Sequence, residues 1–160
     1  MRRLLFVLAL MLSVSGVVAK EVSSTKALEV ARGVFGNSTR SSELCVVWDS
    51  HVLNPTRAYT APTFYVVTPK SGRGFAIVAG DDSIVPILAY STQYSVSQEG
   101  VLPPNFEAWL RYVDSVVSYA RLHGKVATKA IAQLWTEIYI PANATLLNTA
   151  RWSQYLPYNK

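Results

Sequence analysis

The sequence predicts an α+β fold, in which a small antiparallel sheet is covered by an N-terminal helix and by a long amphipathic helix. Three observations carry this prediction. An apolar stripe with helical spacing lies near the N-terminus, strand-like runs joined by turn residues fill the middle, and a longer helical stripe follows them. The 160 residues are enough for one domain whose core folds without disulfides.

The first helix is expected to begin near Ser24 or Thr25, because either side chain can cap a helix N-terminus. Gly36 and Asn37 tolerate the left-handed conformation, so the helix is expected to end there. Between these limits the apolar residues recur at helical spacing: Ala27, Val30, Ala31, Val34 and Phe35.

Four short segments are expected to be strands, because they are rich in β-branched, aromatic and other apolar residues. A turn at 69–73 joins the second and third as a hairpin, and Gly80-Asp81-Asp82 interrupts the pattern before the fourth. The expected strands are Cys45–Trp48, Thr63–Thr68, Gly74–Ala79 and Pro86–Tyr90.

The long helix follows the segment Leu102–Asn105, and Gly124 is expected to end it. One face is predicted to cover the sheet, and it carries Phe106, Trp109, Leu110, Val113, Val116, Val117 and Ala120. The next segment allows two interpretations, a short helix over Ala127–Ile131 or an extended segment over Leu134–Ile140.

Residues 1–19 are expected to be a secretory signal peptide. Two arginines, Arg2-Arg3, precede the apolar run Leu4–Leu12, and small residues follow up to Ala19. A membrane-spanning helix would need about 18 apolar residues, and this run is shorter. We therefore expect a secreted or periplasmic protein that begins at Lys20 after cleavage.

Few residues are candidates for catalysis or metal binding. The single cysteine, Cys45, excludes an intramolecular disulfide, and its apolar strand predicts a core thiol. His51 and His123 are expected in surface or capping roles. The pair Asp81-Asp82 could bind a hard cation or exchange protons, but it is expected to form a turn that bonds the local backbone. We therefore expect no catalytic residue, no cofactor and no metal site.

The charge pattern argues against nucleic acid as a partner. The net charge of +5 falls to +3 without Arg2 and Arg3, and the remaining cations are scattered along the chain. Nucleic-acid surfaces instead concentrate Lys and Arg, often among aromatic residues. After the signal peptide, no later stretch is apolar enough to predict a membrane span.

Several segments, taken in order, resemble the propeptide of streptopain-like cysteine proteases and the free streptopain-inhibitor domain. The resemblance covers about Ser23 to Ala120. The segments that carry it are Phe64–Val67, Gly74–Ser83, Pro86–Ser91, Leu102–Asn105 and Ala108–Leu110.

The C-terminal tail is similar to a different part of that family, the start of the mature protease domain. The similar residues are Leu146, Leu147, Trp152, Gln154, Pro157, Tyr158 and Asn159. The resemblance thus implies a signal peptide at 1–19, a propeptide-like inhibitor domain at 20–140, and a linker with the start of a missing protease domain at 141–160. The family's catalytic cysteine and histidine lie beyond this point, so the resemblance assigns no catalytic residue here.

The function implied by the resemblance is a secreted, non-catalytic module that blocks the active site of a streptopain-type cysteine protease. The protease would be a partner in cis, for a precursor, or in trans, for a free inhibitor. Two alternatives remain: a secreted binding or adhesion domain with the same fold and no protease target, and the N-terminal part of an intact protease. The resemblance does not say which loop would enter the cleft.

Overall fold

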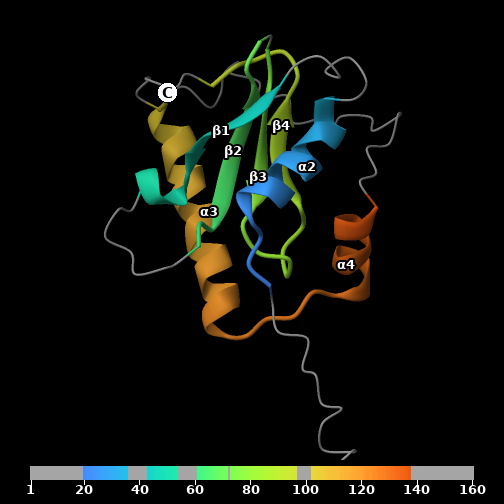
Figure 1. The fold of residues 1–160 in the computed structure, drawn as a ribbon. Helices are drawn as coiled ribbons and strands as arrows, with labels where there is room; N and C mark the ends of the chain where they lie inside the picture. Colours follow the sequence, from blue (N-terminus) through green and yellow to red (C-terminus); the bar gives the residue numbers. More distant parts are fainter. Residues whose placement is uncertain (1–19, 36–42, 54–60, 72, 97–101, 138–160) are drawn as a thin grey trace, which may run out of the picture.

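Two helices cover opposite faces of a four-stranded antiparallel sheet, which confirms the predicted α+β class (Figure 1). The computed structural model describes residues 20–35, 43–53, 61–71, 73–96 and 102–137. The strands lie in sequence order, each paired with the next. In chain order the elements are α2 (Ser24–Phe35), β1 (Leu44–Asp49), the 3-10 turn η2 (Ser50–Val52), β2 (Phe64–Pro69), β3 (Phe75–Ala79), β4 (Ile87–Ser91), α3 (Pro104–Leu122) and α4 (Lys129–Thr136).

Strand β2 shows why the sheet has two covered faces. All six of its residues are buried, and successive side chains of a strand point to opposite faces. Tyr65 and Val67 pack in the core beneath α2, whereas Phe64 and Val66 pack in the core beneath α3. Because both faces are covered, the sequence of β2 does not alternate between apolar and exposed polar residues.

Helix α2 buries four of the five residues of the predicted stripe, Ala27, Val30, Ala31 and Val34, against the sheet, and the fifth, Phe35, is half-buried. Its N-terminus is capped one residue earlier than expected, because the Ser23 hydroxyl accepts a hydrogen bond from the Lys26 amide at 3.2 Å. The predicted stop at Gly36 and Asn37 lies outside the described residues.

Helix α3 begins with Pro104 in its first turn, where the missing N–H is harmless. It ends in a Schellman motif: the Lys125 amide donates to the Ala120 carbonyl at 2.9 Å, and the Gly124 amide donates to the Arg121 carbonyl at 3.1 Å. Gly124 has a φ of 56°, a conformation in which glycine avoids the penalty of a Cβ. The predicted stop at Gly124 is confirmed.

The buried stripe of α3 is narrower than the sequence predicted. Its fully covered apolar residues are Leu110, Val113, Val117 and Ala120. The prediction was wrong for Val116, which is 37% exposed because it lies on the flank of this stripe. Phe106 and Trp109 stack on each other at 6.1 Å between ring centroids and are only half-buried. Leu110, not Trp109, is therefore the central core side chain of the helix.

The segment that the sequence left undecided contains α4. The Thr128 hydroxyl caps this helix by accepting a hydrogen bond from the Ile131 amide at 3.3 Å. Its buried residue is Trp135, whose indole N–H donates to the Ile84 carbonyl at 2.8 Å and whose ring joins the core beneath α2. Residues 129–136 are thus helical rather than extended, and 138–140 lie outside the described residues.

The expected signal peptide at 1–19 and the tail at 141–160 also lie outside the described residues. Within residues 20–137, apart from the gaps between the described segments, no helix is long and apolar enough to cross a bilayer.

Candidate functional site

The cysteine and the two histidines lie apart, on different elements. Cys45 is half-buried on β1, which corrects the expectation of a core thiol, and its Sγ lies 3.7 Å from the Thr68 carbonyl. His51, in η2, faces the Asp49 carboxylate at 3.2 Å. His123 caps α3, and its ring stacks on Tyr119 with 3.9 Å between centroids. These contacts pair neither histidine with the thiol.

The adjacent carboxylates Asp81 and Asp82 point in different directions, as expected for a turn. Asp81 is buried, and its Oδ1 accepts from both the amide and the hydroxyl of Ser83, at 3.0 and 2.5 Å. Asp82 is turned the other way and accepts from the backbone nitrogen of Lys20 at 2.7 Å. Among the residues that the structure describes, no three His, Cys, Asp or Glu side chains gather as a metal site would require.

A buried ion pair joins α3 to the end of the sheet, and we call it the clamp: Arg121 with Asp81. The Arg121 Nε lies 3.1 Å from the Asp81 Oδ2, and the two side chains are 12% and 1% exposed. The guanidinium also donates to three backbone carbonyls, those of Ala61, Pro62 and Gly80, at 2.8, 2.9 and 2.6 Å. The planar fork of an arginine suits such a set of acceptors.

A second polar contact anchors the middle of α3. Asp114 is 2% exposed on the sheet-facing side of the helix, and it accepts from the Thr63 hydroxyl at 2.6 Å. The Thr63 amide in turn donates to the Ser50 hydroxyl at 2.9 Å. Together with the clamp, this contact fixes the position of α3 along the sheet, because hydrogen-bonded buried groups tolerate little displacement.

The first described residues form a short pairing with the β3–β4 turn. The Val22 amide donates to the Gly80 carbonyl at 2.9 Å, and the Asp82 amide donates to the Lys20 carbonyl at 3.1 Å. The Tyr65 hydroxyl donates to the Val22 carbonyl at 2.7 Å. Burial, and next the charge of Asp49, raise the pKa of Tyr65, so this hydroxyl stays a donor further into the alkaline range than an exposed tyrosine would.

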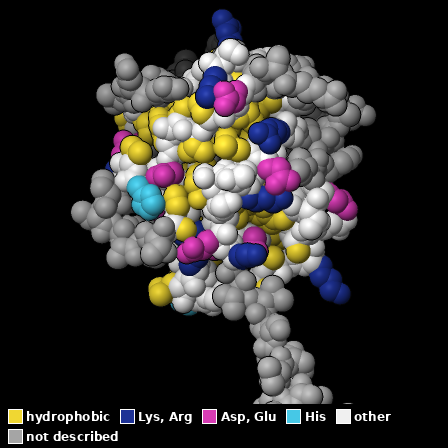
Figure 2. Space-filling view, in the orientation of Figure 1, with side chains coloured by type: hydrophobic (Ala, Val, Ile, Leu, Met, Phe, Trp, Pro, Cys, Tyr) yellow, Lys and Arg dark blue, Asp and Glu magenta, His cyan; other side chains and the backbone are white. Residues whose placement is uncertain are grey.

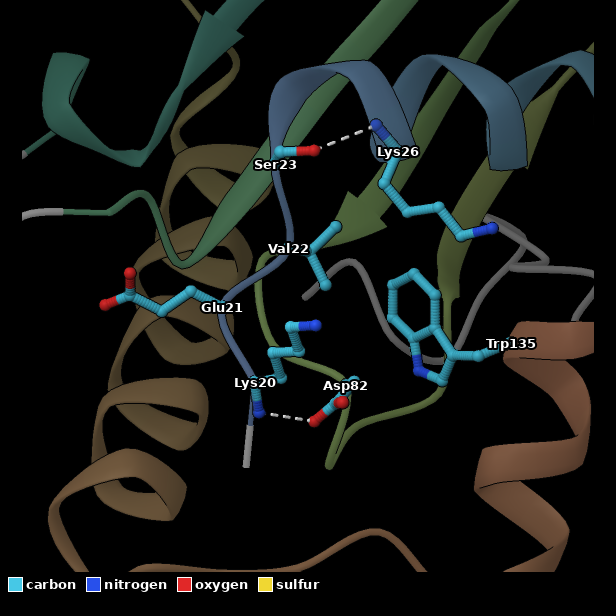
Figure 3. A pocket seen from close by; sticks show the side chains of 7 residues that line it. All are labelled: Lys20, Glu21, Val22, Ser23, Lys26, Asp82 and Trp135. Atoms are coloured by element: carbon cyan, nitrogen blue, oxygen red, sulfur yellow. Dashed lines mark hydrogen bonds between the residues drawn. The ribbon is translucent and has the colours of Figure 1, made fainter. Parts of the chain in front are cut away.

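A pocket of about 410 Å³ opens between this N-terminal segment and α4 (Figure 3). The Trp135 ring forms one wall, and the aliphatic part of Lys26 extends across the opening. The Lys26 ammonium is paired with Glu29 at 3.0 Å. The lining residues are Lys20, Glu21, Val22, Ser23, Lys26, Asp82 and Trp135. The pocket mixes an aromatic wall with charges of both signs, so its chemistry fits a contact surface better than a catalytic centre.

Helix α3 carries aromatic side chains on the side opposite its buried stripe, a surface that we call the α3 outer face. It comprises Tyr112 and Tyr119, which lie seven residues apart and so two helical turns apart on the same side, with Val116 between them at the edge towards the buried stripe. Tyr112 is 65% exposed and Tyr119 is 57% exposed. Tyrosine is enriched at protein interfaces because it combines a large apolar ring with a hydroxyl.

The face of the molecule on the α2 side carries a different mixture of side chains from the α3 outer face (Figure 2). There Lys and Arg side chains are interspersed with Asp and Glu and with hydrophobic side chains (Figure 2). A contact on this face would therefore combine charges of both signs with apolar area.

The sequence did not predict three features of the site: the buried clamp, the pocket wall formed by Trp135, and the contact between Lys20 and Asp82. The clamp had a local signal, because Arg121 lies four residues after Val117 and hence on the buried side of α3. A charge in that position requires a buried acidic partner. Nothing in the local pattern identified the partner, which is 40 residues away.

Before any comparison, these features define an α+β domain whose helix α3 is held to the sheet by buried polar contacts. The Spi protease inhibitor family matches residues 19–117, and the chain belongs to this family. The family indicates a protease inhibitor, a protease as the partner, and a chain that is not itself a protease. Comparisons with curated proteins and with solved structures found no match.

Proposed function

We propose that this chain is exported and inhibits a streptopain-type cysteine protease by lying across its active-site cleft and excluding substrate. The observation that carries the proposal is the family match, since residues 19–117 span the first segment, the whole sheet and most of α3. A pre-formed surface suits this role, because little conformational entropy is lost when a rigid inhibitor binds.

The same domain serves either in trans, as a free inhibitor, or in cis, as a propeptide. The similarity of residues 146–159 to the start of a mature protease supports the form in cis, in which the linker 142–145 before them is the activation site. In both forms the inhibitory unit is the α+β domain, so the tail contributes little to binding in trans.

We place the protease contact on the α3 outer face. Its tyrosines are among the most exposed large side chains of the described residues, and α3 is anchored by the clamp and by Asp114. A rigid helix that presents exposed rings matches the anchor residues that dominate interface energies.

The proposal predicts inhibition by residues 20–140 without the tail. Titration of a streptopain-type protease against a peptide substrate should give inhibition constants for 20–140 and 20–160 that agree within about threefold, a difference below 1 kcal/mol. A papain-like protease of another family serves as the control and should keep its activity. Inhibition by the longer chain only would move the domain boundary, and no inhibition by either chain would favour the adhesion alternative.

The contact surface is tested by the double substitution of Tyr112 and Tyr119 with alanine. We expect the inhibition constant to rise about tenfold or more, the effect of losing an interface anchor. The melting temperature should hardly change, because both side chains are exposed in the free protein. Tyr94→Ala is the matched control, since Tyr94 is 73% exposed but lies after β4, outside α3. If Tyr94→Ala weakens inhibition and the α3 variant does not, the contact lies near β4 instead.

A further inference from the structure

The backbone nitrogen of Lys20 lies against a carboxylate. It donates to the Asp82 Oδ1 at 2.7 Å, the short end of the usual range for an N–H···O hydrogen bond (Figure 3). The Asp82 amide donates back to the Lys20 carbonyl at 3.1 Å, and Glu21 pairs with Asp81 as an isolated β-bridge. The first described residue is therefore held by its main chain at both its nitrogen and its oxygen.

Removal of a signal peptide would change the chemistry of this nitrogen. Hydrolysis of the Ala19–Lys20 bond by a signal peptidase consumes one water molecule and leaves a carboxylate on Ala19. Lys20 gains an amino group that carries a proton near neutral pH, because free α-amino groups have pKa values of about 7.7–8.0. A neutral amide with one hydrogen thus becomes an ammonium with three hydrogens and a full positive charge.

Of the three carboxylates near this nitrogen, Asp82 is the one positioned to pair with the new ammonium group, whereas Asp81 and Glu21 are not (Figure 3). Among the described residues, the Asp82 carboxylate accepts its hydrogen bond from the Lys20 nitrogen. Asp81 is already engaged by Arg121 and Ser83. The Glu21 side chain points to the other side of the segment, away from Trp135 and from the Lys20 nitrogen (Figure 3).

We propose that Asp82 is the receptor for the α-ammonium group of the processed chain. Cleavage after Ala19 then creates an ion pair that tightens Lys20–Val22 on the β3–β4 turn. This segment forms one side of the pocket and accepts the hydrogen bond from Tyr65, so processing stabilises the domain that acts as the inhibitor. The inference rests on the export part of the proposed function and is independent of which protease is bound.

The test is a double-mutant cycle on the purified chain. One form begins at Lys20 with a free amino group, and a second begins at Lys20 but is acetylated on the α-nitrogen. Acetylation should raise the unfolding equilibrium constant about two- to fivefold, the range for a partly exposed ion pair. In Asp82→Asn, whose side-chain oxygen still accepts but carries no charge, acetylation should have almost no effect. In 1 M salt the effect in the wild-type chain should shrink, since charges are screened within about 3 Å.

Glu21→Gln is the matched control, because it removes a carboxylate from the same segment but not from the Lys20 nitrogen. In this variant the effect of acetylation should equal that in the wild-type chain. An equal effect of acetylation in Asp82→Asn would overturn the proposal, and so would an exported protein whose intact mass shows a first residue other than Lys20. Neither readout uses a protease, so the proposal and the inhibitory function can fail separately.

Discussion

Replacing Arg121 with alanine is expected to lower the free energy of unfolding by about 3–5 kcal/mol, the usual cost of removing one partner of a buried ion pair. The Asp81 carboxylate is 1% exposed and would remain in the core without its cation. The carbonyls of Ala61, Pro62 and Gly80 would lose a donor at the same time. Urea unfolding measures the change through the midpoint at an unchanged slope.

Arg111→Ala provides the control, because Arg111 lies on the same helix and also pairs with a carboxylate. Its partner is Glu107 at 2.7 Å, and both side chains are exposed to solvent, at 48% and 37%. Such a surface pair contributes less than about 1 kcal/mol. Arg121→Lys should fall between the two, since lysine keeps the charge but lacks the planar fork. Equal costs for the two alanine variants would show that the clamp does not hold the domain together.

The clamp also connects stability to the proposed function. Arg121 lies in the last turn of α3, two residues after Tyr119 on the outer face. If α3 loosened from the end of the sheet, its outer face would lose the fixed orientation that a rigid inhibitor requires. The Arg121 variant should therefore inhibit less well even at temperatures where it remains folded.

The fold was predictable because each element has a strong local pattern. The strands are dense in β-branched and aromatic residues, and α2 shows an apolar stripe at helical spacing. The pattern overstated the width of the α3 stripe, because Val116 fits helical spacing but lies where the sheet no longer reaches it. Segment α4 stayed ambiguous because a run of only eight residues is short enough to be either a strand or a helix.

The polar contacts of the candidate site were less predictable than the fold, because they join residues that are far apart in the sequence. The clamp joins residues 40 apart, and the Lys20–Asp82 contact joins residues 62 apart. The pattern did predict that Asp81 and Asp82 would form a turn, but not that each would find a distant partner. Such partners depend on how the helices dock on the sheet, which local periodicity does not specify.

Gly80→Ala is expected to destabilise the domain by about 3 kcal/mol or more, at or above the upper end of the usual cost of overpacking. A Cβ at this position would collide with the Pro62 carbonyl oxygen and would lie 2.7 Å from the Thr63 carbonyl carbon. Both are main-chain atoms, and the segment cannot move aside easily because the Gly80 amide donates to the Thr63 carbonyl at 2.8 Å. The Gly80 carbonyl also accepts from Val22 and Arg121, so a shift would disturb the N-terminal segment and the clamp together.

Gly124→Ala separates this effect from the general cost of losing a glycine. A Cβ at Gly124 would meet nothing within 4 Å, but the φ of 56° is unfavourable for alanine. That conformational penalty is about 1–2 kcal/mol. Thermal or urea unfolding of both variants should therefore rank Gly80→Ala well below Gly124→Ala in stability, and only the Gly80 variant should lose inhibition at temperatures where the wild-type chain is folded. The reverse order would mean that the main chain at Pro62 and Thr63 yields easily, and that Gly80 is not the point at which three separate segments of the chain are held together.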